Sequence, residues 1–335
     1  MRTIAVLNQK GGVGKTTTVA NVAAALAAAG RKVVAIDLDP QAHLTIHLGV
    51  EPQALETGGY EVLTQSADFG ASLMLVRPNL WLLGANINLV GAETELVNVV
   101  GREIILREAM QASQDKFDFC LIDCAPSLGL LSLNALAAAQ EVLIPLQPHF
   151  LALQGFGKLL QTVDLVNKRI NPRLRVTGVL LCMHDTRASL SNEVRADIDR
   201  FLQSARGSNN AWSGAEILPA FIRRNIKLAE APSYGQTIFE YDPTCNGAED
   251  YGNVAKFLLG IDAKPAPAPA VAAPEPQSDD PTPASPAAPP IPITTVNLPA
   301  PRCYSPVPIW TEPKASTPPV SPEPQGDIPG AISQA

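Results

Sequence analysis

The chain has 335 residues, with 25 lysines and arginines against 32 aspartates and glutamates, so its formal net charge is −7. This balance excludes a uniformly basic nucleic-acid-binding protein but is compatible with a local basic surface. Five cysteines are too few, and odd in number, for a disulfide scaffold, which fits a reducing compartment and predicts a cytoplasmic protein.

Composition divides the chain into two parts. Residues 263–335 contain 21 of the 31 prolines but only two aromatic residues, Tyr304 and Trp310. A proline-rich segment without a repeat buries too little apolar surface to offset the entropy of ordering. We therefore predict one folded domain over 1–262 and a disordered tail, which is either a passive spacer or recruits a partner through 299–313.

Within the first 262 residues, short apolar runs alternate with helix-like segments. Most of these runs are unbroken, as is typical of strands that are covered on both faces. Strands are predicted at 3–8, 32–37, 80–84, 117–123, 142–146, 176–182 and 216–222. Helices are predicted at 15–29, 102–114, 130–139, 154–169 and 190–203. The alternation predicts an α/β fold, with a doubly wound, mostly parallel sheet and helices on both faces.

A glycine-rich segment follows the first predicted strand and precedes a helix. It reads Lys10-Gly11-Gly12-Val13-Gly14-Lys15-Thr16-Thr17, and Gln9 stands where the usual phosphate-loop pattern has glycine. The glycines allow a tight loop whose backbone N–H groups approach phosphate oxygens, and the start of the helix favours an anion. Lys15 can reach the β- and γ-phosphates of a nucleotide, and the Thr16 hydroxyl can ligate Mg²⁺.

Carboxylates stand at or just after the ends of two predicted strands. They are Asp37, Asp39 and Asp123. Ligand sites of α/β proteins lie at the carboxyl ends of the strands, so we expect these side chains near the phosphate loop. A carboxylate in this place can bind a metal or cap a helix, and for Asp37 both alternatives stay open.

The segment 10–17 resembles the deviant Walker A box of the ParA/MinD group of P-loop ATPases, in which a lysine replaces the early glycine. The resemblance continues through Asp37-Leu38-Asp39-Pro40-Gln41, Leu121-Ile122-Asp123-Cys124-Ala125-Pro126-Ser127-Leu128-Gly129, Glu230-Ala231-Pro232-Ser233-Tyr234-Gly235, Tyr241-Asp242-Pro243 and Gly247-Ala248. These blocks span residues 3–260 in order and leave out the tail. The chain is most similar to the short, chromosomal-type ParA partition ATPases, because no DNA-reading domain precedes residue 3.

The resemblance implies a cycle of slow ATP hydrolysis and a role for each matching residue. Lys10 would reach the nucleotide of a partner subunit in an ATP-dependent homodimer, and Asp39 would orient or activate the attacking water. The expected catalytic residues are Lys10, Lys15 and Asp39, and the expected Mg²⁺ ligands are Thr16, Asp37 and Asp123. The expected nucleotide-binding residues are Lys10, Gly11, Gly12, Val13, Gly14, Lys15, Thr16, Thr17, Arg224 and Asn225.

Three positions depart from the pattern of that group. Ala42-His43 replaces the usual Gly-Asn, and Cys124 replaces a residue that is commonly threonine or proline. Arg223 replaces the proline that usually opens the segment Arg223-Arg224-Asn225-Ile226-Lys227-Leu228, which helps to line the adenine pocket. The departure at Arg223 leaves the details of base recognition open.

Basic residues are concentrated in 168–227, which holds 11 lysines and arginines against five acidic residues. Arg187 matches a position associated with DNA contact, and the further candidates are Arg195, Arg223, Arg224 and Lys227. Phosphate contacts carry no base information, so binding to double-stranded DNA should be non-specific and salt-dependent, unless this is an ordinary solvated face. The resemblance also implies a nucleoid-associated protein whose hydrolysis a ParB-like partner stimulates.

Three alternative functions remain within the same superfamily. A MinD-like membrane ATPase needs a C-terminal amphipathic helix, which the frequent prolines of the tail oppose, so no stable membrane association is expected. A ParA-like ATPase can also position a protein cargo. An ATPase with an iron–sulfur cluster needs ligating cysteines, whereas Cys120 and Cys124 lie in an apolar run and are predicted to be buried thiols.

Overall fold

The computed structural model describes residues 1–149, 152–185 and 187–261. The predicted tail, with its candidate docking segment 299–313, lies outside the described residues. The structure therefore does not test whether the tail forms the C-terminal helix that the membrane alternative requires. No helix of the described part is long and apolar enough to cross a membrane. Cys120 and Cys124 are free and buried, as predicted.

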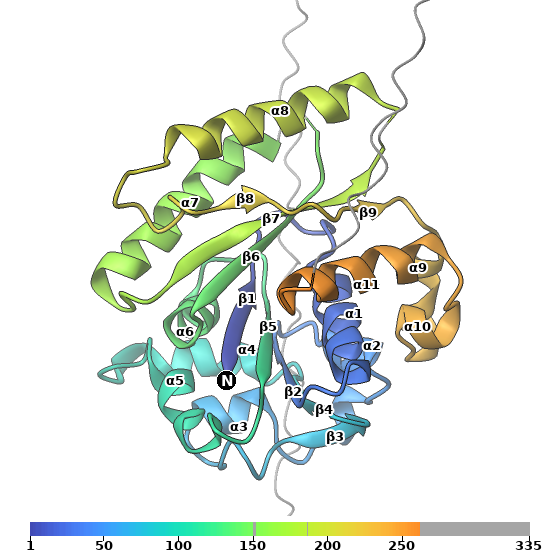
Figure 1. The fold of residues 1–335 in the computed structure, drawn as a ribbon. Helices are drawn as coiled ribbons and strands as arrows, with labels where there is room; N and C mark the ends of the chain where they lie inside the picture. The colour runs from blue at the N-terminus through green and yellow to red at the C-terminus, as the bar shows by residue number, and fades with distance from the viewer. Residues whose placement is uncertain (150–151, 186, 262–335) are drawn as a thin grey trace, which may run out of the picture. The chain divides into compact units, whose positions relative to one another are not determined.

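Strands and helices alternate along the described chain (Figure 1). The strands are β1 Arg2–Val6, β2 Val33–Leu38, β3 Met74–Arg77, β4 Leu80–Leu83, β5 Phe119–Cys124, β6 Glu141–Leu146, β7 Arg175–His184, β8 Glu216–Ile217 and β9 Ile222–Arg223. The helices are α1 Lys15–Ala28, α2 His43–His47, α3 Gly59–Leu63, α4 Leu89–Glu95, α5 Ile105–Ala109, α6 Leu130–Ala138, α7 Ala152–Arg169, α8 Ser189–Ser204, α9 Lys227–Glu230, α10 Ile238–Tyr241 and α11 Asn246–Leu258. Short 3₁₀ turns are η1 Pro52–Ala54, η2 Leu96–Asn98, η3 Gln111–Ser113 and η4 Ala231–Tyr234.

The strands form a sheet in the order β3-β4-β2-β5-β1-β6-β7-β8, and β9 pairs with β7. Every pairing is parallel except that of β3 with β4. Strand β1 lies in the middle of the sheet. The strands β2 to β5 lie on one side of it, and the strands β6 to β8 lie on the other. The predicted doubly wound, mostly parallel fold is confirmed.

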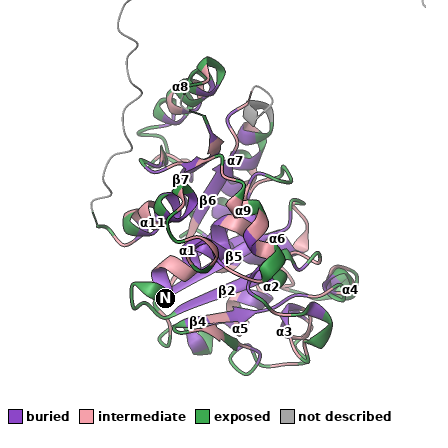
Figure 2. Cartoon of the chain, turned by 90° about the vertical axis from the view of Figure 1, so that its right-hand side faces the viewer, coloured by how far each residue is buried: buried purple, intermediate pink, exposed green. Residues whose placement is uncertain are grey.

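Two apolar cores cover the two faces of the sheet, so the central strands are buried between helices (Figure 2). Alternate residues of β1 divide between the cores: Ala5 packs with residues of α3 to α8, and Ile4 packs with residues of α1, α2, α10 and α11. Burial on both faces is the reason for the unbroken apolar runs in the sequence.

The predicted strand 216–222 is two short strands, β8 and β9, in the structure. Pro219 lies between them, and its lack of an N–H group prevents a continuous hydrogen-bonded strand. The predicted helix 102–114 is limited to α5 and the turn η3, and the edge strand β3 and the helix α11 were not predicted.

Candidate functional site

The phosphate loop joins β1 to α1, and two of its glycines have backbone conformations that other residues rarely adopt. Gly12 has φ 72° and Gly14 has φ 93°, and Gly14 is the residue that caps the start of α1. A side chain at either position would strain the loop. The glycines therefore let the chain turn sharply from the sheet into a helix whose N-terminus faces the cavity described below.

Lys15 begins α1 and is buried, with 7 % of its surface exposed. Its Nζ donates a hydrogen bond to the Lys10 carbonyl oxygen at 3.3 Å. Burial lowers the pKa of Lys15, and the nearby carboxylates of Asp123 and Asp39 oppose this shift. A cation held in this way, beside backbone N–H groups, is suited to bind phosphate oxygens.

Asp123, at the end of β5, contacts the start of α1. The Thr16 hydroxyl donates to Asp123 Oδ2 at 2.7 Å, and the buried Oδ1 has no hydrogen-bond partner among the described residues. Burial, and then the charge of Asp37 on the neighbouring strand, raise the pKa of Asp123 well above its usual range. A hydroxyl and a carboxylate with a free oxygen are donors that fit Mg²⁺.

Asp37 has a different environment, although it lies opposite Asp123 in the register of β2 and β5. Its Oδ2 accepts hydrogen bonds from the backbone N–H and the hydroxyl of Thr45, at 2.9 and 2.7 Å, and its Oδ1 accepts from the N–H of Asp39 at 3.1 Å. Burial raises its pKa to about 6. This geometry favours a structural role over the expected metal role, because both oxygens already hold the loop between β2 and α2.

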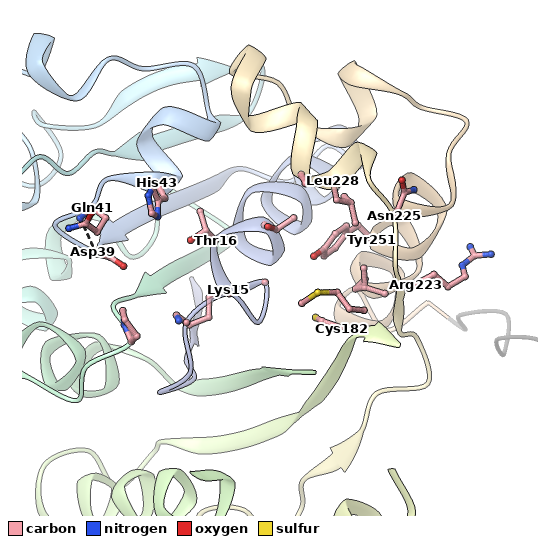
Figure 3. A pocket seen from close by; sticks show the side chains of 18 residues that line it. Lys15, Thr16, Asp39, Gln41, His43, Cys182, Arg223, Asn225, Leu228 and Tyr251 are labelled. Carbon is pink, nitrogen blue, oxygen red and sulfur yellow. Dashed lines mark hydrogen bonds between the residues drawn. The ribbon is translucent and has the colours of Figure 1, made fainter. Parts of the chain in front are cut away.

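The loop glycines, Lys15 and Thr16 line a cavity of about 500 Å³. The polar end, seen in Figure 3, has Lys15 and Thr16 beside Asp39, Gln41 and His43. The full lining is Gly11, Gly12, Gly14, Lys15, Thr16, Thr17, Asp39, Gln41, His43, Pro126, Cys182, Met183, Ile222, Arg223, Asn225, Leu228, Ala229 and Tyr251. A polar end and an apolar end together fit the triphosphate and the base of a nucleotide.

Asp39 lies at the polar end, on the loop that Asp37 holds. Its Oδ1 accepts a hydrogen bond from the N–H of Gln41 at 3.0 Å, and its backbone carbonyl accepts from Ala42 at 2.8 Å. His43, whose position departs from the resembled pattern, lines the same cavity. The second carboxyl oxygen of Asp39 is available to a ligand in the cavity.

Not every residue expected to bind the nucleotide lies in this cavity. Arg224 does not line it, and neither do Lys10 and Val13, which line a separate pocket of about 250 Å³ with His149. Lys10 is exposed, and its Nζ contacts Nε2 of His149. Lys10 therefore lies outside the nucleotide cavity of its own subunit.

The apolar end of the cavity was predicted only in part: the segment 223–228, expected to line the adenine pocket, contributes Arg223, Asn225 and Leu228, whereas Cys182 and Tyr251 were missed. Cys182 lies near the end of β7, beside the phosphate loop, whereas Leu228 and Tyr251 come from α9 and α11. The place of Cys182 near the carboxyl end of a parallel strand was a usable signal. Tyr251 carried none, because a buried helix residue that packs and one that contacts a ligand have the same sequence pattern.

The candidate DNA-contact residues have different surroundings. Arg187 and Arg195 are exposed at the start of α8 and on its surface, and Arg224 is exposed beside β9. Lys227 pairs with Glu230 at 3.1 Å. Arg223 pairs with Asp250 and Glu249, each at 2.6 Å, which argues against the expectation that it contacts DNA.

Comparison with known proteins gives consistent matches. Residues 1–176 match the AAA domain family. The chain is 42% identical over 254 residues to the sporulation initiation inhibitor protein Soj of Bacillus subtilis, covering 76% of this chain and 96% of that protein. It is 38% identical over 275 residues to the chromosome partitioning protein ParA of Myxococcus xanthus, covering 81% and 92%.

The chain belongs to the ParA/Soj family of chromosome-partitioning ATPases. A solved structure of cobyrinic acid a,c-diamide synthase from Mycobacterium smegmatis, with bound ADP and magnesium, is 37% identical and has a TM-score of 0.65, covering 77% of this chain and 94% of that one.

Proposed function

We propose that this ATPase is a nucleotide-driven switch: ATP binding joins two subunits into a homodimer, and hydrolysis separates them. The observation that carries the proposal is that Lys15, Thr16 and Asp39 line one cavity, with Asp123 hydrogen-bonded to Thr16. The reaction is the hydrolysis of ATP to ADP and phosphate, with Mg²⁺ as cofactor. The useful product of the reaction is a change of state of the protein, which positions a cargo, and not a metabolite.

At the polar end of the cavity, the loop glycines and Lys15 bind the triphosphate. Thr16 and Asp123 hold the metal, and Asp37 fixes the loop that carries Asp39. Bound Mg²⁺ offsets the charge of the β- and γ-phosphates. Asp39 accepts a hydrogen bond from the attacking water and orients it in line with the γ-phosphate.

Lys10 supports the dimeric switch from its position outside the nucleotide cavity. Its exposed ammonium group is free to turn from His149 to a phosphate on a second subunit. A lysine that bridges subunits neutralises phosphate charge only in the dimer, which couples nucleotide occupancy to assembly. The base binds at the apolar end of the cavity, where Asn225 also lines the wall.

The dimer is expected to bind double-stranded DNA without sequence preference, through Arg187, Arg195 and Arg224. Their exposure supports this surface. A ParB-like protein would stimulate hydrolysis and so release the dimer from DNA. These partners imply a cytoplasmic, nucleoid-associated protein, whose cargo is a chromosome, a plasmid or a protein cluster.

Two substitutions test the nucleotide switch. Lys15→Ala should lower ATP affinity about 100-fold, because a charge-assisted phosphate contact is lost. Asp39→Ala should keep ATP affinity, lower kcat by about 10²–10⁴-fold and leave the dimer trapped with ATP. Gel filtration with ATP and a phosphate-release assay measure both, and an Asp39 variant that stays monomeric and hydrolyses normally contradicts the assignment.

The domain boundary is a separate proposal. Because the described fold ends with α11, truncation after Asp262 should leave folding, ATPase activity and ATP-dependent dimerisation close to normal. Activity that is lost on truncation would place part of the tail in the functional domain. Comparison of full-length and truncated protein in cells then tests whether the tail recruits a partner or is a spacer.

A further inference from the structure

Arg223 is bound by two acidic side chains of α11, Asp250 and Glu249. Its Nε lies 3.0 and 3.1 Å from the two carboxyl oxygens of Asp250, and its Nη2 lies 2.6 Å from Asp250 and 2.6 Å from Glu249. The backbone N–H of Arg223 also donates to Asp250 at 2.8 Å. The Asp250 side chain is 7% exposed and that of Arg223 is 34% exposed, so the contact is shielded from water on the Asp250 side.

The segment that Arg223 holds forms one wall of the nucleotide cavity. Strand β9 pairs with β7 at only two positions, Cys182 with Ile222 and His184 with Arg223, so backbone pairing alone fixes it weakly. The same segment carries Ile222, Asn225 and Leu228 into the cavity. A strong side-chain contact at Arg223 therefore compensates for a short strand.

The contact partner, α11, is itself fixed to the rest of the site. The Tyr251 hydroxyl lies 3.3 Å from the Thr18 hydroxyl on α1, the helix that starts at the phosphate loop. Gly247 lies against Leu228, where an added Cβ would come within 2.9 Å of the Leu228 side chain. The wall, α11 and the phosphate-loop helix thus form one connected unit.

Arg223 is among the residues that line the cavity, but its guanidinium points away from the base end. Figure 3 shows its guanidinium directed away from Tyr251, Leu228 and Cys182. Two carboxylates surround one guanidinium, so the local charge is negative and disfavours a DNA phosphate.

We propose that Arg223 is a positioning residue for the nucleotide base: through Asp250 it holds the wall formed by residues 222–228 against α11. The inference rests on the proposed function, because it assumes that the base occupies this end of the cavity. It gives a role to the arginine at the position where the resembled pattern has proline.

The test separates the base end of the site from the phosphate end. Affinities for Mg²⁺-ATP and for inorganic tripolyphosphate with Mg²⁺, which has no base, are measured by calorimetry on the full chain. Arg223→Ala should weaken ATP about tenfold and leave tripolyphosphate within about twofold. Arg223→Lys should lie between, because an ammonium group cannot form the two-pronged contact.

Two further variants complete the design. Asp250→Asn should match Arg223→Ala, and the double variant should be no worse than either, because both remove one interaction. Arg200→Ala is the matched control, since Arg200 forms an exposed ion pair with Asp197 on α8, away from the cavity. It should leave both affinities unchanged.

The outcomes discriminate between the two proposals. Unchanged ATP affinity in Arg223→Ala, or an equal loss of ATP and tripolyphosphate affinity, overturns the positioning role while leaving the ATPase proposal intact. If Arg223→Ala lowered only the affinity for DNA, Arg223 would be a DNA-contact residue, and the positioning role would likewise be overturned. A wild-type chain that binds neither ATP nor tripolyphosphate would contradict the proposed function and, with it, this inference.

Discussion

His47 and His43 lie four residues apart on α2 in opposite environments. His43 is exposed and lines the cavity, whereas His47 is 1% exposed and its Nε2 has no hydrogen-bond partner among the described residues. Burial, and then the positive charge of Arg77, lower the pKa of His47 to about 4. The buried imidazole is therefore neutral where an exposed one would take up a proton.

This difference predicts a pH-dependent stability. Below the ordinary value of 6.5 the unfolded chain binds a proton at His47 that the folded chain does not, so the free energy of unfolding falls as pH drops from about 7 to 4. The loss is at most about 1.4 kcal/mol per pH unit. Urea unfolding at several pH values should show a shallower decline in His47→Gln than in wild type, with His43→Gln as control. Parallel profiles for wild type and His47→Gln would contradict the prediction.

At the scale of elements, α1 connects the phosphate loop to the C-terminal helices. Asn21, a polar residue in an otherwise apolar stretch of α1, is buried. Its Oδ1 accepts a hydrogen bond from the backbone of Ile238 at 2.7 Å, and its Nδ2 donates to the carbonyl of Thr17 at 2.8 Å. One side chain thus joins α1 to α10.

Asn21→Ala should therefore destabilise the fold by about 1–3 kcal/mol, because it leaves the Ile238 N–H buried without a partner. Urea unfolding measures the change. Gln203→Ala, which removes an exposed hydrogen bond to Asp199 on α8, is the control and should cost less than about 0.5 kcal/mol. Equal effects of the two substitutions would show that Asn21 does not join the helices.

The elements also show what sequence can predict. Central strands such as β2 and β5 were recoverable because both faces are buried and their apolar runs are unbroken. The polar end of the cavity could be predicted from the sequence, because a glycine-rich loop with Lys15 and carboxylates at strand ends together indicate a phosphate and metal site. The apolar end was recoverable only in part: the segment 223–228 was expected beside the base, whereas Tyr251 becomes a neighbour of the phosphate loop only through the packing of α11. Only the structure shows that Asp37 supports a loop and that Arg223 faces Asp250.

At the scale of the whole molecule, an acidic chain is proposed to bind an acidic polymer. The overall charge of −7 opposes this, so binding depends on where the exposed basic residues lie. Arg187 lies between β7 and α8, and Arg195 lies on α8; both side chains are exposed. Dimerisation would double such contacts without changing the chain, which links DNA affinity to ATP.

Charge reversal at Arg187 or Arg195 should accordingly weaken DNA binding equally for duplexes of different sequence, while leaving ATP affinity unchanged. If each arginine contacts one phosphate, a dimer loses about two contacts, and the slope of log affinity against log salt should become shallower by about 2. Fluorescence anisotropy with labelled duplexes, with ATP and across salt concentrations, measures both quantities. Arg102→Glu is the control, because Arg102 pairs with Glu103 away from α8. Unaltered slopes in both α8 variants would place the DNA surface elsewhere, and binding to anionic vesicles in place of DNA would favour the membrane alternative.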